Sequence, residues 1–242
     1  AQQLDEIYNR SSAPAEGETM TVENTIVKTV ISFILLLAGA AIGWITAPAV
    51  PLLWIGAAIV AFVLALVNIF KKEPSAPLIL AYAAAEGVFI GGISAFYEAM
   101  WPGVVVQAVI ATLVVVGVTL ALFASGKIRA SAKATKVFLI AMVGYLVFSL
   151  VNIGIMIFGG AGGNPWGLRG SVEIFGIPLG VILGVFVVIL AAYSLVLDFD
   201  FIQRGVNNKA PAKYGWTGAF GIMVTVVWLY LELLRMFAIA RN

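Results

Sequence analysis

The sequence contains no cysteine and no histidine, and few of its residues carry a charge. Without cysteine the chain has neither a disulfide framework nor thiolate chemistry. Without histidine it lacks the commonest metal ligand and general base. Charged residues make up 11% of the chain, against about 25% in soluble proteins. The formal net charge of +2, with no basic cluster interleaved with aromatic residues, argues against a nucleic-acid partner.

Long apolar segments dominate what is present. The chain is 62% hydrophobic and its mean hydropathy is +1.06. Runs of about 20 apolar residues are long enough to cross a hydrocarbon core about 30 Å thick. We therefore predict an all-α integral membrane protein, a bundle of seven transmembrane helices in the lipid bilayer. The predicted spans are 26–47, 49–70, 77–98, 103–125, 135–158, 174–200 and 217–239.

The lysines and arginines are distributed unevenly between the two ends of these spans. Of the 14 basic residues, all fall on the N-terminal side of the bundle except three, Arg169, Arg235 and Arg241. The positive-inside rule then predicts a multi-pass protein of the cell membrane with its N-terminus in the cytoplasm and its C-terminus outside. Residues 1–24 are polar and acidic and predict a flexible cytoplasmic tail, which leaves residues 25–242 as the transmembrane domain.

Glycines recur at a spacing of four residues in several predicted spans. This small-xxx-small pattern allows the backbones of two helices to approach closely. A threefold series in the sixth span predicts that this helix is central in the bundle rather than lipid-facing. The pattern occurs at Gly39/Gly43, at Gly87/Gly91 and at Gly176/Gly180/Gly184.

Two of the acidic residues within the spans have a basic residue on the same helical face. Arg204 follows Asp200 by four residues, and Arg235 follows Glu232 by three. These are the spacings at which side chains of opposite charge pair on a helix. We predict that Asp200 forms an interfacial ion pair and that Glu232 is neutralised by Arg235 in the same way.

Asp198 and Glu86 have no such partner on their own helices. A carboxyl group at membrane depth needs a partner or a purpose, and for Glu86 a hydrogen bond to Tyr82 is one explanation. Desolvation favours the neutral form of a carboxyl group, so such a group can change its protonation state near physiological pH. Hard cations such as Ca²⁺ prefer carboxylate oxygens. We interpret Asp198 as a titratable gate, and as a Ca²⁺ ligand, on a path for Ca²⁺ or H⁺.

Four segments of the sequence resemble a known family. "DFDFIQRG" at the end of the sixth span and "WLYLELLRMF" in the last resemble the transmembrane Bax inhibitor motif family. "TMTVENTIVKT" and "PGVVVQAVIATLVVVGVTLALFASGKIRAS" resemble its bacterial branch, which implies a bacterial inner membrane. The resemblance implies a seven-helix bundle whose last helix runs through the middle. It also implies two acidic residues, on the sixth and seventh helices, that share a proton and gate a Ca²⁺ leak.

The resemblance fixes one of these two acidic positions and leaves the other open. Asp198 matches the first. Matching "LYLE" places the second at Glu232, whereas anchoring on the following Leu-Leu-Arg places it at Thr225, which cannot titrate. At about 1.5 Å per residue, Glu232 lies about 20 Å from the cytoplasmic face, deeper than Asp198. Glu86 is therefore an alternative partner.

The sequence predicts a pH-sensitive calcium leak channel rather than an enzyme, with no bound cofactor. A retinal protein would need a lysine within the last span, and the spans contain neither that lysine nor a Ser–His pair for proteolysis. Some bacterial relatives are thought to restrain a membrane-anchored quality-control protease. A regulator of such a protease is thus the alternative function, with the tail and the basic loop 126–136 as contact surfaces.

Overall fold

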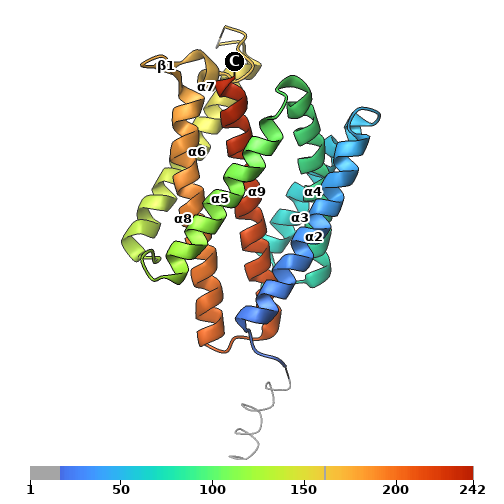
Figure 1. The fold of residues 1–242 in the computed structure, drawn as a ribbon, viewed down its shortest axis with the longest axis vertical. Helices are drawn as coiled ribbons and strands as arrows, with labels where there is room; N and C mark the ends of the chain where they lie inside the picture. Colours follow the sequence, from blue (N-terminus) through green and yellow to red (C-terminus); the bar gives the residue numbers. More distant parts are fainter. Residues whose placement is uncertain (1–16, 161, 242) are drawn as a thin grey trace, which may run out of the picture.

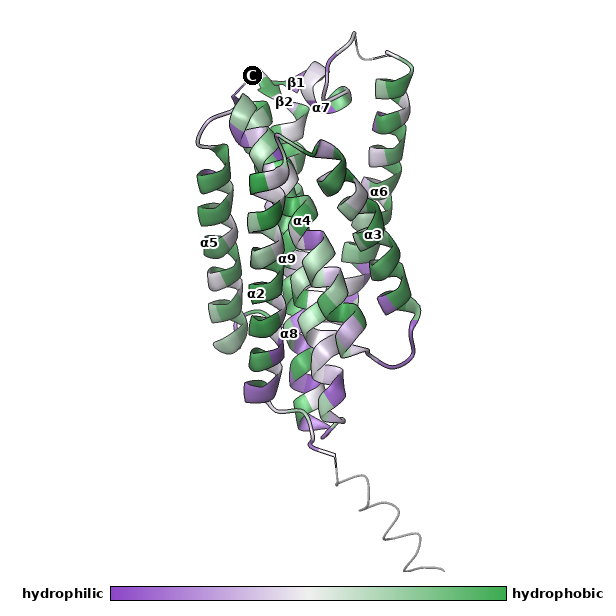
Figure 2. Ribbon diagram, turned by 90° about the vertical axis from the view of Figure 1, so that its right-hand side faces the viewer, coloured by the Kyte–Doolittle hydropathy of each residue, from purple (hydrophilic) through white to green (hydrophobic). Residues whose placement is uncertain are grey.

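Seven long helices run the length of the molecule in the computed structural model, which describes residues 17–160 and 162–241 (Figure 1). They are α2 (Val22–Thr46), α3 (Pro51–Phe70), α4 (Ala76–Met100), α5 (Val104–Ala124), α6 (Ala132–Ile157), α8 (Leu179–Asn207) and α9 (Gly215–Ala240). Each belongs to a segment long and apolar enough to cross a bilayer, so the predicted all-α, seven-span membrane fold is confirmed. Hydrophobic residues run along the helices, and many hydrophilic ones gather near the end where α8 joins α9 (Figure 2).

A capping box starts α2, directly after a docked segment. The Thr21 hydroxyl accepts a hydrogen bond from the Asn24 N–H, and the Asn24 side chain accepts one from the Thr21 N–H, each 3.0 Å long. The reciprocal bonds satisfy two backbone donors that the first turn leaves free. Before them, Met20 is 2% exposed and its N–H donates to the Ala210 carbonyl at 2.7 Å. Of the predicted tail 1–24, the helix takes the part from Val22, and residues 1–16 lie outside the described residues.

The predicted glycine contacts join α2 to α4. A Cβ atom built at Gly39 would lie 2.5 Å from the Ala84 carbonyl oxygen. A Cβ at Gly43, Gly87 or Gly91 would overlap a backbone carbonyl oxygen of the facing helix. The two backbones therefore touch along two turns, with no side chain between them, as the spacing predicted.

The last helix, α9, lies in the middle of the bundle, between α8 on one side and the α2–α4 pair on the other (Figure 1). Fully buried residues recur along its whole length, which confirms the central position expected for it. They include Ala219, Met223, Leu229, Leu234 and Ala238. A short 3₁₀ helix, η2 (Ala212–Tyr214), joins α8 to α9.

The sixth span was predicted at 174–200, but its helix, α8, begins at Leu179 and ends at Asn207. A one-turn helix, α7 (Leu168–Ser171), and a hairpin of β1 (Glu173–Ile174) and β2 (Ile177–Pro178) precede it. The hairpin turn needs left-handed backbone at Phe175 (φ 52°) and Gly176 (φ 78°), so helix cannot start there. The predicted start was wrong, and Gly176 does not belong to the helical glycine series.

The other two glycines of the series, Gly180 and Gly184, form the close helix contact that their spacing predicted. A Cβ atom at Gly180 would meet the side chain of Ile239, and one at Gly184 would meet Met236. These glycines allow α8 to pack closely on α9. The predicted end was also wrong: α8 continues to Asn207, so Asp198 lies more than two turns before the end of its helix.

Candidate functional site

Asp198 is held at the contact between α8 and α9. The Thr225 hydroxyl of α9 donates to Asp198 Oδ2 at 2.7 Å, and Ser194, one turn earlier on α8, lies 3.1 Å from the same hydroxyl. The other carboxylate oxygen, Oδ1, lies where a Cβ atom at Gly221 would be 2.8 Å away. A glycine on α9 thus makes room for the carboxyl group, and a threonine one turn further on orients it.

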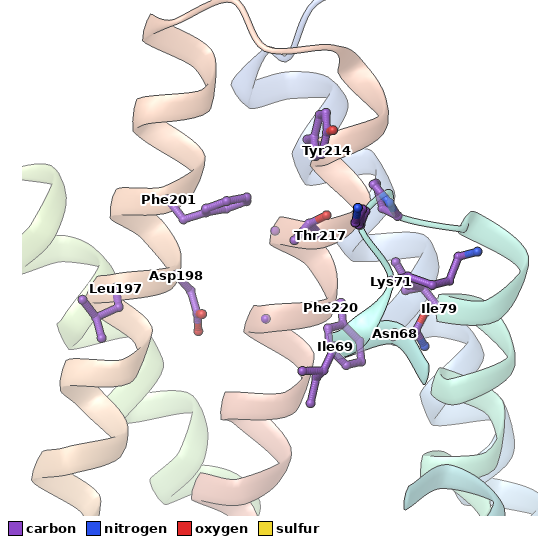
Figure 3. Close-up of a pocket in the computed structure, with 14 residues that line it drawn as sticks. Asn68, Ile69, Lys71, Ile79, Leu197, Asp198, Phe201, Tyr214, Thr217 and Phe220 are labelled. Carbon is purple, nitrogen blue, oxygen red and sulfur yellow. The ribbon is translucent and has the colours of Figure 1, made fainter. Parts of the chain in front are cut away.

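The carboxyl group lines a cavity of about 440 Å³ between α3, α4, α8 and α9. Figure 3 shows Asp198 directed from α8 toward α9, with Thr217 and Phe220 of α9 beside the space and Lys71 at the end of α3 across it. Asn68 also lines the cavity, and its buried side-chain oxygen has no hydrogen-bond partner in the described part of the chain. The cavity therefore brings together a carboxylate and a hydroxyl, those of Asp198 and Thr217, whereas the Asn68 oxygen beside it is covered by protein.

Asp200, two residues from Asp198, is outside this site. Its Oδ2 lies 2.8 Å from Nε of Arg204, whose side chain is 68% exposed. The predicted ion pair between Asp200 and Arg204 is confirmed. The two aspartates in "DFDF" thus have different environments, because positions two apart point to different sides of a helix.

Glu232 lies in a second polar cluster, further along α9. Its Oε1 is 3.2 Å from Nη1 of Arg235, which confirms the predicted ion pair, and it also accepts a hydrogen bond from the Tyr145 hydroxyl of α6. Arg169 of α7 donates to the same hydroxyl at 3.0 Å and to Ser149 at 3.2 Å. The second cluster therefore consists of Glu232, Arg235, Arg169, Tyr145 and Ser149.

Sequence reasoning missed Arg169, Tyr145 and Ser149, and also Asn152, which holds Arg169 in place. Asn152 is fully buried, and its side chain accepts from the Leu168 N–H at 2.6 Å and donates to the Trp166 carbonyl at 3.1 Å. These bonds fix the segment before α7 against α6. The signal was the spacing of Tyr145, Ser149 and Asn152, which puts three polar residues on one face of an apolar helix.

The structure separates Asp198 from Glu232 and pairs it with Thr225. Thr225 and Glu232 are seven residues apart on α9, about 10.5 Å along the axis. Of the two alignments left open by the sequence, the geometry agrees with the one that places Thr225 opposite Asp198. The two acidic residues therefore do not share a proton through direct contact.

Glu86 lies at a similar depth to Asp198 but on a different helix. Contacts between Tyr82 and the Phe220 ring and between Ser94 and Tyr230 set the register of α4 against α9. In this register Glu86 falls near the level of Thr225. It forms no hydrogen bond or ion pair among the described residues, so the bond to Tyr82 that the sequence suggested is not made. The residues described also contain no group of three or more acidic side chains placed to hold a metal ion.

The hydroxyl partner of Asp198 makes a testable contribution to stability. Replacing Thr225 with valine keeps the shape of the side chain and removes the donor to the carboxylate, which leaves that group without its hydrogen bond. We expect the free energy of unfolding in detergent micelles to fall by about 1–2 kcal/mol. The matched control is Thr46→Val, which removes an exposed hydroxyl bonded to its own helix and changes stability by less than about 0.5 kcal/mol. Equal effects of the two changes would contradict the assignment.

Together, the fold and its two polar clusters define a seven-span membrane protein with ionisable groups inside the bundle. The comparison with known families makes the assignment specific. The profile of the Bax inhibitor 1 like family matches residues 3–242, and the chain belongs to that family. The comparison with curated proteins gave no match.

Proposed function

We propose that the protein is a pH-sensitive leak channel for Ca²⁺ across the cell membrane, and not an enzyme. The observation that carries this proposal is the Asp198 carboxyl group lining a cavity within a bundle of apolar helices. In this proposal the N-terminus is cytoplasmic, and the cavity lies toward the cytoplasmic end, where α8 joins α9.

The chemistry of the cavity supports a hard cation as the transported species. A carboxylate and a hydroxyl are oxygen ligands of the kind that Ca²⁺ prefers. They come from Asp198 and Thr217, which line the same space. This incomplete set of ligands, with one carboxylate, suits transient passage better than tight binding. Ca²⁺ is accordingly a cargo in this proposal rather than a resident cofactor.

The dependence on pH follows from the same carboxyl group. An ionised Asp198 attracts a cation, whereas a protonated one does not, so proton binding and cation entry compete at one position. Thr225 donates to the carboxylate, and no second acidic side chain bonds to it among the described residues. One titrating group therefore suffices for the proposed gate, without the acidic pair that the family resemblance implied.

The proposal predicts that Asp198→Asn removes the pH dependence of Ca²⁺ flux. The purified protein would be placed in liposomes loaded with a Ca²⁺ indicator, and flux measured from about pH 6 to about pH 8. We expect the flux of the wild type to change over this range and that of the variant to stay constant, because an amide cannot titrate. Asp200→Asn is the matched control, since it neutralises an aspartate two residues away whose partner Arg204 is exposed to solvent.

Two results would contradict the leak proposal. One is a flux that is equal with and without protein at every pH. The other is an effect of Asp200→Asn as large as that of Asp198→Asn. The first result would favour a regulator of a membrane-anchored protease, a role that neutralising Asp198 leaves intact and deleting residues 1–16 removes.

A further inference from the structure

The two polar clusters lie on one stripe of α9. Thr225 and Glu232 are seven residues apart, close to two full turns, so they point to the same side of the helix. Thr225 meets Asp198 of α8 on this side, and Glu232 meets Tyr145 of α6. Leu229, which is 0% exposed, lies between them. We call this stripe and the residues of α6, α7 and α8 that face it the α9 seam.

The far part of the α9 seam carries more positive than negative charge. Two guanidinium groups, those of Arg169 and Arg235, contact the Tyr145 hydroxyl, but the one carboxylate beside it, that of Glu232, forms its ion pair with Arg235. In the described part of the chain Arg169 has no carboxylate within ion-pair distance. Its guanidinium is held by two hydroxyl groups and by the rings of Tyr145 and Phe148, 5.7 and 5.3 Å away.

Arg169 is inserted into the bundle by a connecting segment. Its residue is 8% exposed, although it belongs to a helix of one turn between α6 and α8. Gly180 makes room for it, because a Cβ atom there would lie 3.0 Å from Arg169 Cβ. Asn152 anchors the preceding backbone to α6. The fold thus places a charged side chain among α6, α8 and α9. Packing by itself would need only a hydrophobic side chain at this position.

We propose that Arg169 is a charge-selecting residue of the leak, and this inference rests on the proposed function. A cation that leaves the level of Asp198 along the α9 seam meets the uncompensated guanidinium beyond Leu229. The repulsion limits cation flux, whereas an anion is attracted by the same charge. Asp198 governs entry by protonation, and Arg169 governs passage by a charge that does not titrate in the physiological range.

Neutralising Arg169 is expected to raise cation flux. With Arg169→Gln we expect Ca²⁺ flux into liposomes to increase at least about tenfold, because removing one charge in a partly buried site changes the energy of a nearby divalent cation strongly. Arg169→Lys keeps the charge and is expected to retain a flux near that of the wild type. The permeability ratio of K⁺ to Cl⁻, from the potential across the same liposomes under a KCl gradient, is expected to rise in Arg169→Gln.

A second variant tests the charge without removing the arginine. Ser149 lies 3.2 Å from Arg169 Nη2, so Ser149→Asp supplies the missing carboxylate while the guanidinium stays in place. We expect the same direction of change in flux and in ion selectivity. This variant decides the question if Arg169→Gln does not fold.

The outcomes separate this inference from the proposed function. If the wild type leaks, and both Arg169→Gln and Ser149→Asp leak equally with an unchanged K⁺ to Cl⁻ ratio, the inference fails and the proposed function stands. A rise in flux that is equal for K⁺ and Cl⁻ also overturns the inference, since it indicates loosened packing. If no protein conducts at any pH, both are overturned.

Discussion

Replacing Glu232 with alanine is expected to lower the free energy of unfolding by about 3–5 kcal/mol. The Glu232 side chain is 7% exposed and is the carboxylate that Arg235 and the Tyr145 hydroxyl both contact. Without it, the guanidinium groups of Arg169 and Arg235 remain close together, with no negative charge between them. Chemical denaturation in detergent micelles, followed by tryptophan fluorescence, measures the loss.

A surface glutamate provides the comparison. Glu73 forms an ion pair of 3.0 Å with Lys213, and its side chain is 67% exposed. Solvent screens such pairs, so Glu73→Ala is expected to cost about 0–1 kcal/mol. Glu232→Gln, which keeps an acceptor for Tyr145, is expected to fall between the two alanine variants. A loss in Glu232→Ala no greater than in Glu73→Ala would show that this carboxylate does not hold the second cluster together.

Replacing Gly91 with leucine is expected to cost about 3 kcal/mol, the upper end for overpacking a well-packed interior. A side chain at Gly91 would overlap the carbonyl of Ala40 on α2, and backbone cannot rotate out of the way as a side chain can. The two helices would have to separate and lose contact along the two turns where their backbones touch. A lower midpoint of thermal unfolding in micelles would report the change.

The control for this change is another glycine within a span. Gly117 of α5 has nothing within 4 Å of its virtual Cβ atom. Gly117→Leu is therefore expected to leave stability unchanged or to raise it by up to about 1 kcal/mol, through the better helix propensity of leucine. If both variants unfold at the same midpoint, the close approach of α2 and α4 does not contribute to stability.

The sequence predicted the spans well because lipid requires long apolar helices and allows few other solutions. It failed at the start of α8, where residues 174–178 are mostly apolar and continue the hydrophobic run. What stops the helix there is the left-handed backbone at Phe175 and Gly176, and hydropathy does not register backbone angles. The glycine pairs of α2 and α4 were predictable because their spacing alone puts them on one face.

The site was predicted only where its partners lie within one helix. The ion pairs Asp200–Arg204 and Glu232–Arg235 follow from helical spacing. The contact of Asp198 with Thr225 depends on how far α8 and α9 are shifted against each other, and one sequence does not determine that shift. Arg169 was counted among the residues outside the membrane, because nothing in its local sequence indicates that its segment folds back into the bundle.

The backbone contact between α2 and α4 also bears on which helices of the bundle can move. Helices whose backbones touch, with no flexible side chains between them, cannot slide or tilt without collision, so we expect α2 and α4 to move together. On the opposite side, Asn152 is the one fully buried residue of α6, a helix that the structure describes in full. A helix attached at a few polar points can swing while its neighbours stay fixed. We therefore expect α6 and the segment that carries Arg169 to move more readily than the α2–α4 pair.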